Sequence, residues 1–273
     1  MNFQGILTPV SAQVTELTSR AAGPIADLDF WAQSLLFVEA SILAYLDMPD
    51  VTKWGTLMGF TRITQRVIPN DLAVTILSNE TDIVVSFRGT QNLANIQENF
   101  DCDLTPDGTL HGKAHDGFLK SFDRIWPTVL PVLDSKKKVW TTGHSLGGAM
   151  AAIACIRANH RAGPNLDGLF TFGQPRIGNF AYVGGVRTDT YRFVNNRDII
   201  PSLPGKFMGF SHFGKEFFID HKGNIAPRSL LSTCTRMSVG LLGLIPLVWD
   251  DHNIINYRKA ILRLNQESAH AQR

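Results

Sequence analysis

The sequence carries little excess charge of either sign. Its 26 Lys and Arg residues nearly balance 24 Asp and Glu residues, which leaves a formal net charge of +2. The dense basic run at residues 136–138 precedes an apolar segment and is typical of a solvated turn at the end of a helix. A nucleic-acid interface needs clustered cations together with groove-reading or stacking elements, so we expect no nucleic-acid partner.

Cysteine is scarce as well. The three cysteines, Cys102, Cys155 and Cys234, have neither CxxC spacing nor histidines at the spacing of zinc ligands. Their odd number and wide separation argue against a disulfide framework. The sequence also lacks an HxxEH pair and the lysine of a phosphate-binding loop. We therefore expect neither a metal site nor a phosphate-binding loop.

Long apolar runs are missing. The longest candidate, at residues 237–249, is shorter than the roughly 18 to 20 residues that span a bilayer. The first ten residues lack the basic region of a signal peptide, and a polar stretch follows them. The sequence alone therefore predicts a cytoplasmic protein, or one exported without a leader.

What the sequence has in quantity is apolar residues, 44% of 273, against 18% charged residues. This composition is typical of a globular protein with a large core. We expect one domain over residues 1–273, with residues 1–26 as an N-terminal arm. Apolar spacings of three and four predict a helix that begins at Asp27 or Asp29 and ends at Pro49. Three strands are predicted next, at 57–64, 72–77 and 83–87, the first two antiparallel.

From residue 118 onward, predicted helices and strands alternate. Pro127 and Pro131 are expected to bend or end the first of these helices. The alternation favours an α/β fold with a mostly parallel central sheet flanked by helices. The predicted helices are 118–133, 146–162, 179–186 and 253–264, and the predicted strands are 139–142, 169–172 and 191–194.

The segment at residues 143–148, GHSLGG, lies between an apolar strand and a helical run, which is the context of a nucleophile elbow. Glycines two positions before and after Ser145 allow the strand and the helix to approach each other closely. The helix N-terminus behind the turn favours negative charge on a substrate oxygen. A helix-entry turn with a capping serine is the alternative. We predict Ser145 as a nucleophile.

A serine nucleophile needs an imidazole base, and the base needs a carboxylate, in the chain order Ser, acid, His. Asp198 directly follows the predicted strand 191–194, at the carboxyl edge of the sheet, and is the predicted acid; a turn or cap role is the alternative. His252 lies at a loop-to-helix junction and is the predicted base. His212 and His221 flank a strand-like stretch and are more typical of hairpin or packing residues.

An oxyanion hole takes one backbone N–H from the residue after the nucleophile, here Leu146, and a second donor from an earlier strand-to-helix loop. Thr90 is the predicted second donor, because the segment Arg88-Gly89-Thr90 follows the strand 83–87. The alternative is that this segment merely ends the strand.

These motifs together resemble the fungal-type, or class 3, lipases. The resemblance spans roughly residues 60 to 260 and is carried by residues 83–90, 115–118, 142–148, 172–178, 195–204 and 251–252. It implies an α/β-hydrolase fold, no cofactor, hydrolysis of acyl-glycerol or related lipid esters, and a triad of Ser145, Asp198 and His252. It also implies a lid within residues 91–104, after the oxyanion threonine.

An apolar insertion at residues 228–249 separates the predicted acid from the predicted base. It is expected to line an acyl pocket, to form a second cover, to contact a lipid surface transiently, or to be a buried helix beside the sheet. The triad also leaves alternative functions open. A phospholipase A1 or an acyltransferase would use the same acyl-enzyme chemistry, and a catalytically silent lipid-binding protein would keep the fold alone.

Overall fold

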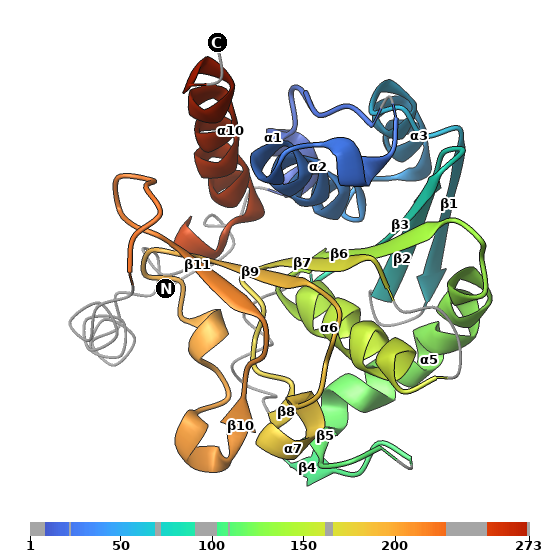
Figure 1. Ribbon diagram of the computed structural model, residues 1–273, viewed down its shortest axis with the longest axis vertical. Helices are drawn as coiled ribbons and strands as arrows, with labels where there is room; N and C mark the ends of the chain where they lie inside the picture. Colours follow the sequence, from blue (N-terminus) through green and yellow to red (C-terminus); the bar gives the residue numbers. More distant parts are fainter. Residues whose placement is uncertain are drawn as a thin grey trace.

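The computed structural model describes residues 9–21, 23–68, 72–90, 103–108, 110–161, 166–227 and 250–271. At its centre lies a seven-stranded sheet in the order β1-β2-β3-β6-β7-β9-β11 (Figure 1). From β3 to β11 all neighbouring strands are parallel, whereas β2 is antiparallel to both β1 and β3. The predicted mostly parallel sheet is confirmed. The strands are β1 Arg62–Ile68, β2 Leu72–Ser78, β3 Asp82–Phe87, β6 Lys138–His144, β7 Gly168–Phe172, β9 Thr190–Asn195 and β11 Lys215–Ile219.

Helices cover both faces of this sheet. Figure 1 shows α2 (Phe30–Leu43), α3 (Met48–Leu57) and α10 (Ile254–Ala271) on one side, and α5 (Asp116–Leu133) and α6 (Leu146–Asn159) on the other. Successive side chains of a strand point to opposite faces of the sheet, so each strand contributes side chains to the cores on both sides. In β3, Val85 and Phe87 pack in the core beneath α5 and α6, whereas Val84 packs in the core beneath α2 and α10.

A second sheet of four two-residue strands lies beside α7 (Phe180–Val183), at the bottom of Figure 1. Its order is β10-β8-β5-β4, and each pair in it is antiparallel. Two short 3-10 helices, η3 (Ile200–Ser202) and η4 (Lys206–Met208), connect β9 to this sheet. The strands are β4 Leu104–Thr105, β5 Ala114–His115, β8 Gly178–Asn179 and β10 Phe210–Ser211.

The structure corrects two predictions around Pro49. Helix α2 already ends at Leu43, and Pro49 lies in the first turn of α3, which Asp47 caps by accepting the N–H of Asp50. A proline in a first helical turn loses no intrahelical hydrogen bond. The strand predicted at 57–64 is wrong in its first half, because α3 continues to Leu57 and β1 begins at Arg62.

Of the two expectations for Pro127 and Pro131, to bend or to end the helix before β6, the structure excludes the second. Helix α5 contains both Pro127 and Pro131 and continues to Leu133. Its buried side chains, which include Phe122 and Val129, belong to the core beneath the sheet. Tertiary packing of this apolar face outweighs the poor helix propensity of proline.

The part of the arm that the structure describes is attached to α2 and α10 through the buried carboxylate of Glu39. Glu39 accepts the backbone N–H groups of Thr18 and Ser19, and Arg258 of α10 forms an ion pair with it at 2.7 Å. Leu17 is buried in the core shared with α2. The arm, α2 and α10 are thus joined by one charged contact and one apolar core.

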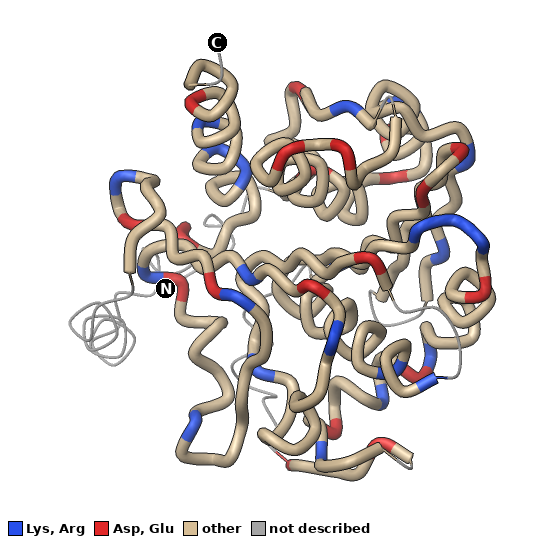
Figure 2. The backbone as a smooth tube through the Cα atoms, viewed as in Figure 1, with Lys and Arg blue, Asp and Glu red and all other residues tan. Residues whose placement is uncertain are grey.

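Within the described ranges, no helix is long and apolar enough to cross a bilayer, and no three metal-binding side chains lie close enough together to hold an ion. Basic and acidic residues are spread over many elements and do not gather on one face of the backbone trace in Figure 2. Cys155 lies buried in α6 as a free thiol, and burial raises its pKa to about 12.

Candidate active site

Ser145 occupies a sharp turn between β6 and α6. Its backbone has φ 58° and ψ −129°, a conformation that L-residues adopt at a cost and that recurs at functional sites. Neighbouring backbone stabilises the turn, because the Ser145 N–H donates to the carbonyl of Phe172 on β7 at 3.0 Å. The side chain therefore lies at the carboxyl end of β6, in front of the N-terminus of α6.

The glycines on either side of Ser145 are required by close backbone contacts. A Cβ on Gly143 would lie 2.3 Å from the backbone of Gly147, and a Cβ on Gly147 would lie 2.1 Å from the carbonyl oxygen of Phe87 on β3. Any side chain at these positions would collide with backbone, which cannot move aside as a flexible side chain can. The glycine spacing read from the sequence therefore has a steric cause.

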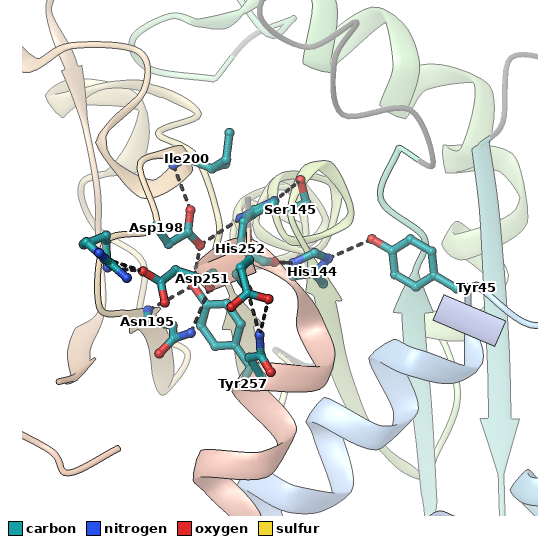
Figure 3. A network of polar contacts seen from close by, with 12 residues as sticks. Tyr45, His144, Ser145, Asn195, Asp198, Ile200, Asp251, His252 and Tyr257 are labelled. Atoms are coloured by element: carbon teal, nitrogen blue, oxygen red, sulfur yellow. Dashed lines mark hydrogen bonds and ion pairs between the residues drawn. The ribbon is translucent and has the colours of Figure 1, made fainter. Parts of the chain in front are cut away.

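The structure brings Ser145, Asp198 and His252 together, although 107 residues separate Ser145 from His252. The His252 Nδ1 atom lies 2.8 Å from Asp198 Oδ2, and His252 Nε2 lies 2.9 Å from Ser145 Oγ (Figure 3). With Nδ1–H donating to the carboxylate, Nε2 is the acceptor for the serine hydroxyl. All three side chains are fully buried. The arrangement can remove a proton from Ser145.

Asp198 is held by two further donors. Its Oδ1 accepts the Ile200 N–H at 2.9 Å, and its Oδ2 accepts the hydroxyl of Tyr257 at 2.5 Å. The Tyr257 oxygen in turn accepts the Asn195 N–H at 3.0 Å (Figure 3). Nothing in the sequence points to Tyr257 in this role, because its position five residues after His252 carries no motif.

Gly173 leaves room for the contact between acid and base. It has φ +62°, and a Cβ there would lie 2.8 Å from Asp198 Oδ2 and 2.9 Å from His252 Cε1. Only glycine adopts this backbone conformation without strain while leaving that space empty. Its signal in the sequence was its position directly after the strand that became β7.

Asp251 connects the segment that carries His252 to the loop that carries Asp198. Its Oδ2 accepts from Asn196 Nδ2 at 3.1 Å and from Arg197 Nε at 3.0 Å, and its backbone carbonyl accepts from Asn195 Nδ2 at 2.9 Å. Burial raises the pKa of Asp251, while the hydrogen bond from Arg197 opposes that rise. We call Asp251, Asn195, Asn196 and Arg197 the Asp251 clamp.

His144 supports His252 from the other side. His144 Nε2–H donates to the backbone carbonyl of His252 at 2.7 Å, which leaves Nδ1 to accept the hydroxyl of Tyr45 at 2.8 Å (Figure 3). Burial, reinforced by the neighbouring His252, lowers the pKa of His144 well below its ordinary value of 6.5. His144 is therefore neutral and links Tyr45, just after α2, to the base.

The predicted oxyanion donors are Leu146, which follows Ser145, and Thr90, which follows Gly89. A Cβ on Gly89 would lie 3.2 Å from the Ser145 Cβ and 2.6 Å from the His144 carbonyl oxygen, so this backbone runs against the elbow. Thr90 follows Gly89 directly, and Leu146 is the first residue of α6. The structure thus brings both predicted segments to the nucleophile, and the roles of Thr90 and Leu146 stay predictions.

Other predicted features lie outside the site or outside the described residues. His212 Nε2 donates to the carbonyl of Pro201, and His221 is exposed in a turn, so neither competes with His252 for Ser145. The predicted lid at 91–104 lies outside the described residues except for 103 and 104, and the insertion at 228–249 lies wholly outside them.

Comparisons with known proteins find similar sequences among lipases. The family model "Lipase (class 3)" matches residues 84–208. The chain is 34% identical over 194 residues to a lipase of Rhizomucor miehei, which covers 63% of this chain and 49% of that protein. It is 33% identical over 153 residues to a secreted mono- and diacylglycerol lipase of Fusarium solani, covering 51% and 44%. The chain thus spans about half the length of the curated relatives that it matches.

Solved structures extend the similarity to the fold. Lipase II of Rhizopus niveus is 30% identical with a TM-score of 0.60, covering 69% of this chain and 81% of that chain. A triacylglycerol lipase whose catalytic centre is a serine protease triad is 30% identical with a TM-score of 0.61, covering 68% and 79%. The fold is that of an α/β-hydrolase. The chain belongs to the class 3 lipase family.

Proposed function

We propose that this protein is a serine ester hydrolase that cleaves acyl-glycerol or related lipid esters through an acyl-enzyme on Ser145. The observation that carries the proposal is the unbroken chain of contacts from Ser145 Oγ through the His252 ring to Asp198. The substrate class rests on the relatives, which are named as mono- and diacylglycerol and triacylglycerol lipases. A lipid ester is accordingly the proposed substrate.

In the proposed mechanism, His252 Nε2 takes the proton of Ser145 as Oγ attacks the ester carbonyl carbon. The backbone N–H of Leu146 and a donor from Thr90 stabilise the resulting oxyanion. The tetrahedral intermediate collapses as His252 gives its proton to the leaving alcohol. Water then attacks the acyl-enzyme by the same route, which releases the fatty acid and restores Ser145.

Asp198 acts in this scheme by holding the His252 ring and stabilising its positive charge. The carboxylate cannot rotate freely, because Ile200 and Tyr257 donate to its two oxygens. Burial of the whole triad strengthens these charge-assisted contacts, since water does not compete for them. The mechanism draws on groups of the chain, the substrate and water, so the proposal includes no cofactor.

The test is reaction of the intact protein with a fluorophosphonate, followed by mass mapping of the labelled peptide. We expect label on Ser145, loss of label in His252→Ala, and undiminished label in His221→Ala, which removes an exposed histidine as a matched control. Label on another residue, or undiminished ester turnover by Ser145→Ala, would contradict the proposal.

Substrate class is tested by product analysis on triglyceride, diacylglycerol and phospholipid, together with a chain-length series of soluble esters. Fatty acid released mainly from acyl-glycerols supports the proposal. Preferential release from the sn-1 position of phospholipid would indicate a phospholipase A1, and transfer of the acyl group to an added alcohol in preference to water would indicate an acyltransferase. Turnover of none of these by a folded protein would indicate a silent lipid-binding protein.

A further inference from the structure

At one corner of the molecule, α7 and η4 expose two phenyl rings. Phe207 is 88% exposed and Phe180 is 79% exposed, the highest values among large apolar side chains in the described ranges, and Met208 is 40% exposed. Single exposed apolar residues are common on protein surfaces. Phe180 on α7 and the pair Phe207 and Met208 on η4 belong to elements that both contact β10, and exposed apolar side chains grouped in this way are typical of interaction sites. We call Phe180, Phe207 and Met208 the aromatic patch.

The pairing of β8 with β10 brings these segments to the same corner. Asn179 of β8 lies opposite Phe210 of β10, and Phe180 follows Asn179 directly. Phe207 belongs to η4, and the left-handed Gly209, φ 87°, leads from η4 into β10. Figure 1 shows α7 and β10 next to each other at this end of the molecule. The rings are thus presented on short, hydrogen-bonded elements.

A cationic cavity of about 200 Å³ adjoins the patch. Arg176, Arg192 and Lys206 line it as permanent cations, and Glu216 is its one carboxylate, so its described walls carry a formal charge of +2. Lys206 directly precedes Phe207 on the exposed turn, and Phe180 itself lines the cavity. The remaining lining residues are Ser211 and His212.

Backbone carbonyls hold both arginines in place. Arg176 Nη1 donates to the Pro204 carbonyl at 2.6 Å, and Arg192 Nε donates to the Phe213 carbonyl at 2.8 Å. These contacts orient the guanidinium groups. The Glu216 carboxylate lies 3.4 Å from Arg192 Nη2 and offsets one charge. Guanidinium groups held in this way match the geometry of a phosphate.

Hydrogen bonds to backbone carbonyls account for the burial of Arg176 and Arg192. They do not account for the presence of Lys206 and the aromatic patch beside these arginines. Proteins that bind membrane surfaces combine apolar side chains that enter the boundary between headgroups and acyl chains with cations that attract anionic lipids. The corner has both components next to each other. An anionic phospholipid surface fits this combination better than a soluble anion, which would make no use of exposed rings.

We propose that the aromatic patch and its cavity dock the protein on an anionic phospholipid surface. The two rings enter the boundary between headgroups and acyl chains, and a lipid phosphate occupies the cavity. This docking surface makes no use of Ser145. The proposal therefore stands or falls apart from the proposed hydrolysis.

The experiment measures partition of Ser145→Ala protein into vesicles of phosphatidylcholine alone and of phosphatidylcholine with phosphatidylserine, so that no turnover alters the lipid. In that background, Phe180→Ser with Phe207→Ser is expected to weaken binding to both vesicles at least about tenfold, because two apolar rings no longer leave water. Lys206→Ala is expected to weaken binding about fivefold, and only to the vesicles that contain phosphatidylserine.

The matched control is Leu57→Ser with Val67→Ser, which removes two other exposed apolar side chains, from α3 and β1. We expect it to bind both vesicles as the Ser145→Ala parent does. Thermal unfolding of every variant checks that these exposed substitutions leave the fold intact.

Four outcomes would overturn the proposal. The ring variant could bind vesicles as well as its parent, or the control could lose as much binding as the ring variant. Calorimetry could also detect inorganic phosphate binding in the cavity while the ring variant keeps its vesicle affinity, which would make the cavity a site for a soluble anion. Failure of the parent to bind either vesicle would equally refute lipid docking and direct attention to a protein partner.

Discussion

The proposed nucleophile Ser145 and the proposed base His252 are held in place by different kinds of structure. Ser145 sits between a strand and a helix, and backbone contacts that admit only glycine at positions 143 and 147 determine its turn. His252 follows residues 228–249 and lies just before α10. Side-chain hydrogen bonds from Asp198, His144 and the Asp251 clamp hold the segment that carries it.

The difference is one of distance along the chain. The turn at Ser145 depends on neighbouring residues and on the packing of β3 against the elbow. This packing is a close steric contact, so an added side chain there collides with backbone and is not partly accommodated. The position of His252 depends on polar pairs between residues more than 50 positions apart, each of which contributes a modest net free energy. We therefore expect substitutions at the elbow to act on folding, and substitutions around His252 to act more on the geometry of the site.

The largest effect is expected for Gly147→Ala. The new methyl group would lie 2.1 Å from the Phe87 carbonyl oxygen, so the helix and the sheet must separate. We expect a loss of about 3 kcal/mol or more in the free energy of unfolding, measured by urea titration. Gly23→Ala is the matched control, because nothing lies within 4 Å of a Cβ there. Equal stability of the two variants would show that the elbow is not sterically determined.

An intermediate effect is expected for Tyr257→Phe. The variant leaves the buried Asn195 N–H without its acceptor and removes one donor to Asp198, at a cost of about 2 kcal/mol. Because the acid then holds His252 less firmly, we expect kcat on a soluble ester to fall about tenfold with little change in KM. Tyr191→Phe, on β9, is the control and should retain kcat. An unchanged kcat in Tyr257→Phe would make Tyr257 a purely structural residue.

The smallest effect is expected in the pH dependence of stability, to which His144 contributes. Its folded pKa lies below 6.5, so the unfolded chain binds a proton near that pH and the folded chain does not. The free energy of unfolding should therefore fall as pH drops below 6.5, by up to about 1.4 kcal/mol per pH unit from this group. His144→Gln keeps a donor for the His252 carbonyl and should show a shallower slope in urea titrations. Equal slopes would mean that His144 is protonated in the folded protein.

The sequence predicted elements well where one physical cause dominated. The strands before and after the elbow, and the helix that became α6, were predicted because apolar runs bounded by turn residues are unambiguous. A failure came at a proline. Pro49 was predicted to end a helix and instead lies in the first turn of α3, because a proline there loses no intrahelical hydrogen bond.

Ser145, Asp198 and His252 could be proposed from the sequence because their residue types, their chain order and the ends of the preceding strands are local information. Tyr257, Asp251 and Tyr45 could not be proposed in these roles. Each acts on a residue that lies far away in the chain, and its residue type alone carries no signal. A tyrosine near a histidine is common, whereas a tyrosine that donates to Asp198 exists only once α10 packs beside β9.

By itself, then, the sequence determined the α/β class, the strained serine turn and the order of the chemical groups, because strand alternation, helix periodicity and the absence of a side chain on glycine act over a few residues. Tertiary structure alone decided how the base meets the acid and which corner of the molecule exposes Phe180 and Phe207. Both outcomes depend on the pairing of strands and on buried hydrogen bonds between distant segments, whose partners no local pattern specifies.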